Sequence, residues 1–377
     1  MPQLDALRAF AVGLVILEHW LPHNQVLEAI NPGYIGVVFF FVLSGFLITK
    51  ILLKNRTDSD NYAIPKAQVL KKFIIRRALR IFPIYYITIF ACFAVGLASI
   101  REKFIWYVLY LSNYFVFYTQ NWGGPLTHLW TLAVEEQFYL FWPLIILFVP
   151  TRWLLLVISS FVVIGPLSRF LIFTLFDSHL TNDLFALILT PSCLDAFGIG
   201  AVLAYFKQEN SDKQTVQKTF SILLVTLLSL FAVTWLIIVD SYQLILVIKG
   251  SIIALASVWV IHRAGKGFEH PLMKSILENG IVVYLGKISY GIYLFHNFIP
   301  YLYTLAVIYS QRYNIRNPLT NDYLFTEIQN PIVRFIIFLS LLILFSAISW
   351  HLVEKPINNL KKQFQYVNSR KVTSAST

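Results

Sequence analysis

Long apolar stretches recur along the 377-residue chain, and short polar or charged segments separate them. Most are about 17 to 25 residues long, the length that an α-helix needs to cross roughly 30 Å of hydrocarbon. The pattern therefore predicts an all-α polytopic membrane protein, a bundle of about ten transmembrane helices. The ten predicted spans are residues 6–22, 34–53, 80–98, 129–149, 152–175, 186–206, 219–239, 243–262, 281–308 and 332–353.

One further apolar stretch, residues 104–118, is aromatic but short, and we predict an interfacial or re-entrant helix there rather than an eleventh span. Residues 1–357 are predicted to form a single transmembrane domain, and residues 358–377 a short polar cytoplasmic tail. We find no internal repeat that would divide the chain further.

Lysine and arginine residues predict the orientation, because cytoplasmic loops retain an excess of them. The segment 54–80 alone holds eight. With both termini in the cytoplasm, 20 of the 30 Lys and Arg residues fall in the inner loops and tail, and four fall in the outer loops. An odd number of spans would destroy this asymmetry, so the charge pattern supports ten spans and cytoplasmic termini.

The composition excludes a water-soluble protein: 57% of the residues are apolar, 13% are charged, and the mean hydropathy is +0.67. The net charge of +11 follows mostly from topology, and with no nucleic-acid motif we expect no nucleic-acid partner. The first helix has no small-residue cleavage site and is expected to be retained. Cys92 and Cys193 lie in apolar segments, so we expect neither a disulfide nor a thiolate metal site, and no metal cofactor.

Ionisable residues within the predicted spans are candidates for function, because each costs about 2.5 to 3.5 kcal/mol at the centre of a membrane helix. Arg8 and His19 are eleven residues apart in the first helix. That spacing puts them within about 20° of one face and roughly 16 Å apart along the axis. The alternatives are a positive-inside anchor for Arg8 and an interfacial histidine for His19.

A second candidate is the pair Arg77 and Arg80 in KKFIIRRALRIFPIYY, which share one helix face at the cytoplasmic end of the third span. Guanidinium groups bind phosphate through two parallel hydrogen bonds, so this face is suited to the phosphates of a soluble donor such as coenzyme A. The alternative is a contact with anionic lipid.

A third candidate is Glu135, which with Glu136 lies about two turns inside the outer end of the fourth span. The two acids differ by about 100° around the helix axis, so they point in different directions. A carboxylate of this span can lie near the depth of His19, where it would fix the imidazole tautomer while the imidazole takes the proton of an attacking hydroxyl. Direct attack on a thioester and transfer through an acyl-histidine both remain open.

Other polar or small residues have competing interpretations. Asp5 is either a helix cap or a partner that orients Arg8. Asp195 is expected to pair with a buried cation or to line a cavity. His296 is a hydrogen-bonded core histidine or part of an acceptor site, and Ser44, Gly45 and Gly291 are more typical of close helix packing than of chemistry.

These motifs, taken in order along nearly the whole chain, resemble the acyltransferase-3 family of integral membrane acyltransferases. The resemblance is carried by LDALRAFAVGLVILEH, GYIGVVFFFVLSGFLI, RRALRIFPIYY, HLWTLAVEEQFYL, CLDAFGIGAVLAY, ISYGIYLFH and VEKPINN. Many relatives have a polar residue, often Asp, where this chain has Val38, so any role of that position is missing here. The hydrolase-like domain fused to some relatives is also missing, so transfer is expected to finish within the bundle or to rely on a separate protein.

The resemblance implies a ten-span bundle that receives coenzyme A from the cytoplasm. It implies that Arg8, Arg77 and Arg80 contact the donor, that His19 is catalytic, and that Glu135 is its partner. The expected activity is transfer of an acyl group, acetyl from acetyl-CoA by the commonest family choice, to a hydroxyl of a carbohydrate or glycolipid of the cell envelope.

The expected location is the bacterial inner (cytoplasmic) membrane. Two other functions compete: a transporter or flippase of a glycan or lipid-linked substrate, and a non-catalytic lipid-binding or scaffold protein.

Overall fold

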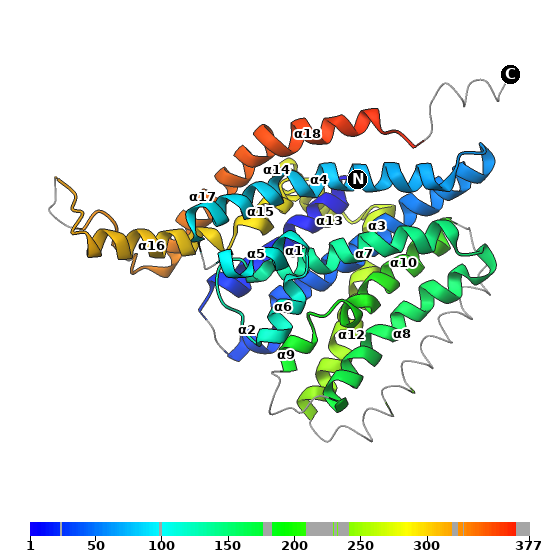
Figure 1. Cartoon of the computed structure of the whole chain (residues 1–377), viewed down its shortest axis with the longest axis horizontal. Coiled ribbons are helices and arrows are strands. Elements are labelled where there is room, and N and C mark those ends of the chain that lie inside the picture. The colour runs from blue at the N-terminus through cyan, green and yellow to red at the C-terminus, as the bar shows by residue number, and fades with distance from the viewer. Residues whose placement is uncertain are drawn as a thin grey trace.

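The chain folds as a bundle of helices, seen in the computed structural model of Figure 1. The structure describes residues 1–22, 25–97, 100–175, 183–208, 229, 232, 241–318, 323–326 and 328–366. Within these ranges there is no β-strand, and the one β-type pairing is an isolated antiparallel bridge between Arg316 and Tyr323. The predicted all-α fold is therefore confirmed for the described residues.

Seven helical stretches among the described residues are long and apolar enough to cross a membrane, which indicates a multi-pass membrane protein. They are Pro32–Asn61 (α3), Lys66–Val95 (α4), Thr127–Phe148 (η2 and α7), Thr151–Leu175 (α8), Tyr242–Lys266 (in α12), Ser289–Arg312 (α15 and α16) and Pro331–Gln363 (α17, η4, α18 and η5).

Three of the ten predicted spans are not among these seven, so ten spans and cytoplasmic termini remain predictions. The first is helix α1 (Pro2–Trp20), which carries three charged residues in its 19 positions. The second is α10 (Leu194–Gln208), which is only 15 residues long because a 3-10 turn at Pro191–Cys193 precedes it. The third, residues 219–239, falls almost entirely outside the described residues.

Helix boundaries depart from the predicted ranges where charge or local geometry intervenes. Helix α4 begins at Lys66, fourteen residues before the predicted start. Its 30 residues extend about 45 Å, so its basic first half projects beyond the roughly 30 Å of hydrocarbon. The predicted helix at 281–308 is instead divided into α14 (Gly280–Lys287), α15 (Ser289–Phe295) and α16 (Phe298–Arg312).

The remaining helices are short. The aromatic stretch 104–118 forms two of them, α5 (Ile100–Val108) and α6 (Ser112–Thr119), and neither is long enough to span a bilayer. Three more connect the longer helices: α2 (Gln25–Ile30), α9 (Asp183–Ala186) and α13 (Pro271–Leu277).

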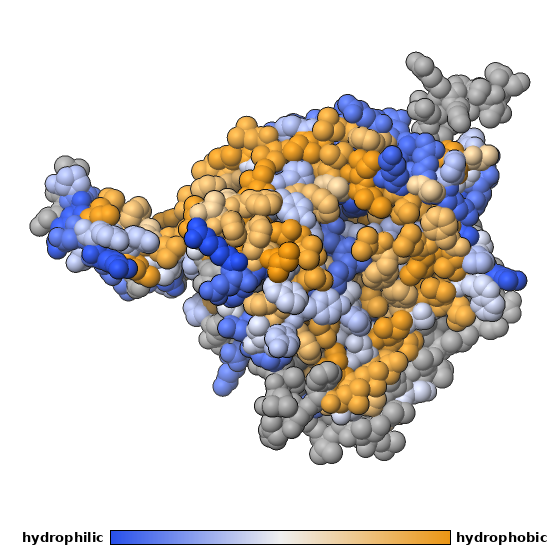
Figure 2. All heavy atoms as spheres, viewed as in Figure 1, coloured by the Kyte–Doolittle hydropathy of each residue, from blue (hydrophilic) through white to orange (hydrophobic). Residues whose placement is uncertain are grey.

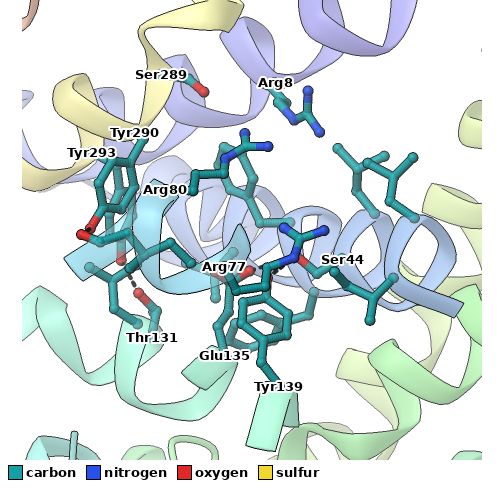
Figure 3. A pocket seen from close by; sticks show the side chains of 18 of the residues that line it. Arg8, Ser44, Arg77, Arg80, Thr131, Glu135, Tyr139, Ser289, Tyr290 and Tyr293 are labelled. Carbon is teal, nitrogen blue, oxygen red and sulfur yellow. Dashed lines mark hydrogen bonds between the residues drawn. The ribbon is translucent and has the colours of Figure 1, made fainter. Parts of the chain in front are cut away.

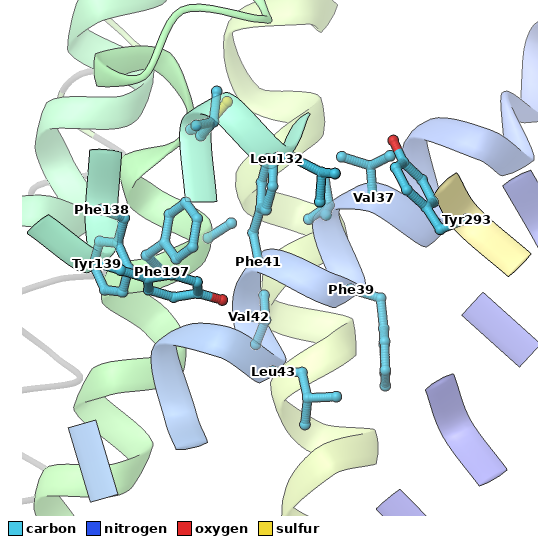
Figure 4. Packing of buried hydrophobic residues seen from close by; sticks show 14 of the residues in the cluster. Val37, Phe39, Phe41, Val42, Leu43, Leu132, Phe138, Tyr139, Phe197 and Tyr293 are labelled. Atoms are coloured by element: carbon cyan, nitrogen blue, oxygen red, sulfur yellow. The ribbon is translucent and has the colours of Figure 1, made fainter. Parts of the chain in front are cut away.

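Helix α3 is the centre of the bundle and packs against α1, α7, α10 and α12. Aromatic rings fill the contact with α7 and α10 (Figure 4). Phe197 stacks between Phe41, at a centroid distance of 4.8 Å, and Phe138, at 4.1 Å. Burial of these rings fixes the helices that line the functional site described below.

Two glycines let α3 and α10 approach closely. A Cβ atom at Gly45 would lie 2.2 Å from the Phe197 carbonyl oxygen, and one at Gly200 would lie 2.1 Å from that of Val42. No side chain larger than hydrogen fits there without moving a backbone. Gly45 is thus a packing residue, as predicted.

Apolar residues cover much of the visible surface of the bundle, whereas hydrophilic ones gather toward its ends (Figure 2). Helix α17 (Pro331–Ser349) shows the apolar surface well, with Ile332, Ile336 and Leu344 exposed. Helices α16 and α17 pack together and extend away from the main body (Figure 1). A π-helical turn (η4, Trp350–Glu354), α18 (Lys355–Asn359) and the 3-10 turn η5 (Leu360–Gln363) follow, and α18 returns to α4.

Candidate functional site

A cavity of about 190 Å³ lies among α1, α3, α4, α7 and α15, and we call it the arginine cavity. Apolar side chains of α3 form much of its wall, and Arg8, Arg77, Arg80 and Glu135 also line it. Figure 3 shows Arg8 approaching from α1 and the other two arginines from α4. The structure therefore brings together four of the five site residues predicted from sequence.

The guanidinium groups of Arg77 and Arg80 form no ion pair with a described residue, although Glu135 lies in the same cavity. Arg77 lies over the rings of Phe73 and Tyr139, 5.6 and 5.5 Å from their centroids. In the part of the chain that the structure describes, neither arginine forms a salt bridge or a side-chain hydrogen bond. Two such cations beside an apolar cavity are suited to bind an anion, since a guanidinium fork matches phosphate or carboxylate oxygens.

Arg8 differs from that pair because it has a carboxylate partner. Its Nη1 donates to Asp5 one turn earlier in α1, and both side chains are partly buried, at 17% and 22% exposed. Asp5 also lies 3.9 Å from the N-terminal amine. Of its two possible roles, the structure supports that of an orienting partner for Arg8.

Glu135 belongs to a small hydrogen-bond network at the cavity wall. The Ser44 hydroxyl donates to Glu135 Oε1 over 2.8 Å, and the Tyr139 hydroxyl donates to Ser44 over 2.9 Å. Ser44 is therefore more than the packing residue predicted from sequence. Glu136 faces a different pocket, with Phe82 and Tyr110, as the 100° spacing of adjacent helix residues requires.

His19 does not line the arginine cavity; it lines a second pocket, formed by the end of α1 with α16 and α17. Its Nδ1 lies 2.8 Å from the Val15 carbonyl oxygen, one turn earlier in α1. The structure thus places His19 and Glu135 in different pockets rather than in one paired site.

The position of His128 explains this separation. His128 precedes Glu135 by seven residues, about 10 Å along a helix, and lies at the level of the His19 region. The ring of His296 lies 4.9 Å from that of His19 and 4.6 Å from that of His128. The fourth predicted span therefore contributes a histidine, rather than Glu135, to this depth.

The three rings, His19, His296 and His128, form what we call the histidine row. His128 Nε2 lies 3.1 Å from the Leu294 carbonyl oxygen and its Nδ1 3.2 Å from the Asn297 amide nitrogen. Both nitrogens of His128 are thus engaged, which fixes its orientation. Among the described residues no cluster has the geometry to hold a metal ion.

His296 keeps one nitrogen without a partner. It is fully buried, and its Nδ1 lies 2.6 Å from the Tyr293 carbonyl oxygen. Its Nε2 has no hydrogen-bond partner among the described residues. The structure therefore supports the buried core histidine, in ring contact with His19, and a role in an acceptor site stays a prediction.

Tyr293 separates the arginine cavity from the histidine row. It lines the cavity, and its ring lies 5.4 Å from that of His296 and 5.5 Å from that of His128. Its hydroxyl donates to the His128 carbonyl oxygen over 3.0 Å and lies 2.6 Å from Thr131 Oγ1. These contacts hold the phenol ring as a wall between the two pockets.

On its other side the arginine cavity adjoins a polar pocket of about 450 Å³, which we call the vestibule. The two share Ile51, Arg77 and Arg80. The vestibule is lined by Ile51, Lys54, Asn55, Asp58, Arg76, Arg77, Arg80, Lys361 and Tyr366. Five of these nine are cationic and one is acidic, so a soluble anion entering here meets positive charge before it reaches the cavity.

The C-terminal segment completes the vestibule. Arg76 Nη1 donates to the carbonyl oxygens of Lys361, at 2.8 Å, and Phe364, at 3.3 Å, and its guanidinium lies 5.1 Å from the Tyr366 ring centroid. Arg76 thus holds this segment against α4.

Several cavity residues were not predicted from sequence. Tyr139, Thr131, Tyr290 and Tyr293 all line the arginine cavity. The available signal was that each lies near a predicted site residue or on a shared helix face, such as Tyr139 one turn after Glu135. Polar residues at such positions are common in membrane helices, so spacing alone does not separate them from packing residues.

Asp195 is paired and fully buried, as its apolar surroundings predicted. Arg169 Nη2 lies 2.7 Å from Asp195 Oδ2, both side chains are 1% exposed, and the Ser251 hydroxyl donates to the same oxygen over 2.6 Å. The group links α8, α10 and α12 and has a structural role.

Known proteins are similar in sequence to most of this chain. The acyltransferase-3 family, described as an acyltransferase domain, matches residues 1–351. The O-acetyltransferase OatA of Staphylococcus aureus (strain MRSA252) is 28% identical over 403 residues, which cover 100% of this chain and 60% of that protein. A putative O-acetyltransferase of S. aureus strain MSSA476 is 29% identical over 386 residues, which cover 94% of this chain and 57% of that protein.

The chain thus spans less than two thirds of the length of these curated relatives. No solved structure matches it. The family match includes α1, the arginine pair of α4, the Glu135 region of α7 and the histidine row, and leaves out Lys361 and Tyr366 of the vestibule. The chain belongs to the acyltransferase-3 family.

Proposed function

We propose that the protein is an O-acetyltransferase that moves an acetyl group from acetyl-CoA to a hydroxyl of a cell-envelope carbohydrate or glycolipid. The family and the names of the relatives support acyl transfer. The observation that carries the choice of donor is the pair Arg77 and Arg80, which forms no salt bridge among the described residues and lies where a cationic vestibule meets an apolar cavity.

The donor fits this pair of pockets by its chemistry. Coenzyme A has a multiply phosphorylated nucleotide end and a long, slender pantetheine arm that ends in the thioester. We assign the phosphates to the vestibule and its arginines, where charge-assisted hydrogen bonds are strong, and the arm to the apolar wall of α3. Arg8 then contacts the donor from the opposite side of the cavity.

In this proposal Glu135 acts in the arginine cavity, where the donor binds. It lies close enough to Arg77 and Arg80 to interact with them electrostatically, and Ser44 donates to it. We infer that the carboxylate keeps the Ser44 hydroxyl directed into the cavity beside the acyl group. This role differs from pairing with His19, which the separate pockets do not support.

His19 is the proposed base on the acceptor side. If Nδ1 donates to the Val15 carbonyl oxygen, Nε2 carries the lone pair that takes a proton from the acceptor hydroxyl. The hydroxyl oxygen forms the new bond to the acyl carbon, the carbon–sulfur bond breaks, and the proton is finally returned to the thiolate of coenzyme A. No metal takes part in this proposal.

The wall formed by Tyr293 and His296 imposes a condition on this reaction. Thioester and hydroxyl must approach to about 3 Å. Either the Tyr293 side chain swings aside for direct attack, or an acyl-enzyme intermediate, such as acyl-histidine, carries the group across. Both routes use the same donor cavity.

The protein is proposed to lie in the bacterial cytoplasmic membrane with the vestibule on the cytoplasmic side, where acetyl-CoA is made. Purified protein in liposomes, supplied with acetyl-labelled acetyl-CoA and envelope glycans, tests the activity. We expect labelled glycan ester and free coenzyme A in equal amounts. Movement of glycan across the bilayer without ester formation would instead identify a transporter or flippase. If neither ester formation nor glycan movement is observed, the scaffold function is the one that is left.

A further inference from the structure

The pocket that contains His19 has the composition of a carbohydrate site. It is about 280 Å³ in volume and lies between the end of α1, α16 and α17. Four aromatic rings, three polar side chains and His19 contribute to its lining. The polar residues are Thr304, Gln311 and Arg334. Polar groups that converge among aromatic and aliphatic side chains are typical of a small-ligand pocket.

The aromatic wall is held in place by its own contacts. The Trp20 indole N–H donates to the His296 carbonyl oxygen over 3.1 Å, which ties it to the histidine row. Its ring lies 5.8 Å from those of both Phe335 and Phe338, and Tyr303 lies 5.2 Å from Phe338. Flat rings fixed in this way can pack against the C–H face of a sugar while leaving its hydroxyls to polar groups.

Arg334 gives the pocket its charge. It is half-buried near the start of α17, and no acidic side chain pairs with it in the described ranges. A guanidinium without a protein counterion favours a ligand that carries a carboxylate or phosphate. Gln311 and Thr304 add the neutral donors and acceptors that sugar hydroxyls need.

The pocket lies at the opposite end of the molecule from the vestibule. Arg334 is near the beginning of α17, whose 19 residues extend about 28 Å, and Lys361 of the vestibule follows beyond its end. Along α1 the same order holds, with Arg8 in the arginine cavity and His19 at the far end. A ligand of this pocket therefore approaches from the face opposite the nucleotide.

We propose that this pocket is the acceptor site and that it takes an anionic carbohydrate, with the acid group on Arg334, the sugar ring on Trp20, and a hydroxyl beside His19. The assignment of the hydroxyl to His19 rests on the proposed acetyl transfer. The binding of an anionic sugar does not, so the two ideas can fail separately.

Ligand binding to the full chain tests the site directly. Calorimetry on protein in zwitterionic-lipid nanodiscs compares a uronic-acid tetrasaccharide with the same tetrasaccharide after reduction of its carboxyl groups. We expect the acidic form to bind about 10- to 100-fold more tightly, the size of a charge-assisted bond. Arg334→Gln removes this preference, Arg334→Lys restores part of it, and Arg312→Gln, which alters a nearby arginine outside the pocket, leaves it intact.

Three outcomes would overturn the proposal: equal binding of the two tetrasaccharides, no binding of either, or equal losses in the Arg334→Gln and Arg312→Gln variants. The same titration is repeated in nanodiscs of phosphatidylglycerol, an anionic lipid. Loss of binding of the acidic sugar in these nanodiscs, but not in the zwitterionic ones, would mean that the pocket binds a lipid headgroup. Coenzyme A binding, measured on the same samples, shows that each variant is folded. If the wild-type protein does not bind coenzyme A, this result counts against the proposed donor site and not against the proposed binding of an anionic sugar.

Discussion

The ring of Tyr293 lies 5.4 Å from that of His296, and the two residues lie between the arginine cavity and His19. Tyr293 lines the arginine cavity, whereas His296 touches His19, which lines the pocket between α1, α16 and α17. The proposed donor and acceptor sites are therefore one residue layer apart. In the proposed reaction, this layer would keep water on the His19 side away from the thioester of the donor.

Removing the Tyr293 ring should allow cleavage of the acetyl-CoA thioester without transfer of the acetyl group to an acceptor. We expect Tyr293→Ala to increase hydrolysis of acetyl-CoA in the absence of acceptor several-fold, because water gains access to the thioester. Tyr293→Phe keeps the ring and loses only the contacts to Thr131 and His128, so its hydrolysis should stay near wild type. The measurement is the rate of coenzyme A release in the absence of glycan. Equal rates for the two variants would contradict the claim that the Tyr293 ring separates the arginine cavity from water.

The arginine pair should determine donor affinity. Arg77→Ala combined with Arg80→Ala is expected to weaken coenzyme A binding by at least 10-fold, since each charge-assisted hydrogen bond contributes about 1.5–3 kcal/mol. Lys71→Ala removes a cation from an exposed position of the same helix and should change binding less than 2-fold. Titration calorimetry compares them, and similar losses would favour a general contact with anionic lipid.

Much of the fold follows from hydropathy, because a membrane helix must satisfy its backbone internally and expose apolar side chains. The exceptions have local causes. Helix α4 starts at Lys66 because good helix-forming residues continue the helix outside the hydrocarbon, where hydropathy gives no signal. The breaks that separate α14, α15 and α16 occur within one apolar run, so composition does not reveal them.

The sequence predicts the relative positions of two site residues when both lie on the same helix. The i, i+3 spacing of Arg77 and Arg80 gives them a common face, and both line the cavity with Arg8. The depth of Glu135 relative to His19 depends on how far α7 slides along α1, which spacing within either helix does not constrain. That is why His128, not Glu135, lies beside the histidine pair.

Loss of the Ser44 hydroxyl should lower the stability of the protein and its affinity for acetyl-CoA. Ser44→Ala leaves the partly buried Glu135 carboxylate without this donor, which costs about 1–3 kcal/mol, and frees the Tyr139 hydroxyl as well. Ser44→Thr keeps the hydroxyl. We expect a lower Tm and a raised KM for acetyl-CoA in the alanine variant alone, and an unchanged KM would remove Ser44 and Glu135 from the donor site.

The buried ion pair of Arg169 and Asp195 should matter for stability rather than for chemistry. Asp195→Ala leaves an uncompensated buried guanidinium and is expected to destabilise the protein by about 3–5 kcal/mol. Asp60→Ala breaks the exposed pair with Lys66, which contributes at most about 1 kcal/mol. Denaturation in detergent compares the two variants, and equal stability would contradict the structural role of Asp195.

The most direct test of the account is acetyl transfer by His19→Ala in liposomes, with coenzyme A binding measured on the same preparation. Loss of a general base lowers the rate typically by about 10²–10⁴-fold. We predict a loss of that size with donor affinity within 2-fold of wild type, because His19 lies outside the arginine cavity. Transfer at the wild-type rate would contradict the proposed base, and with it the assignment of the α16–α17 side of the protein to the acceptor.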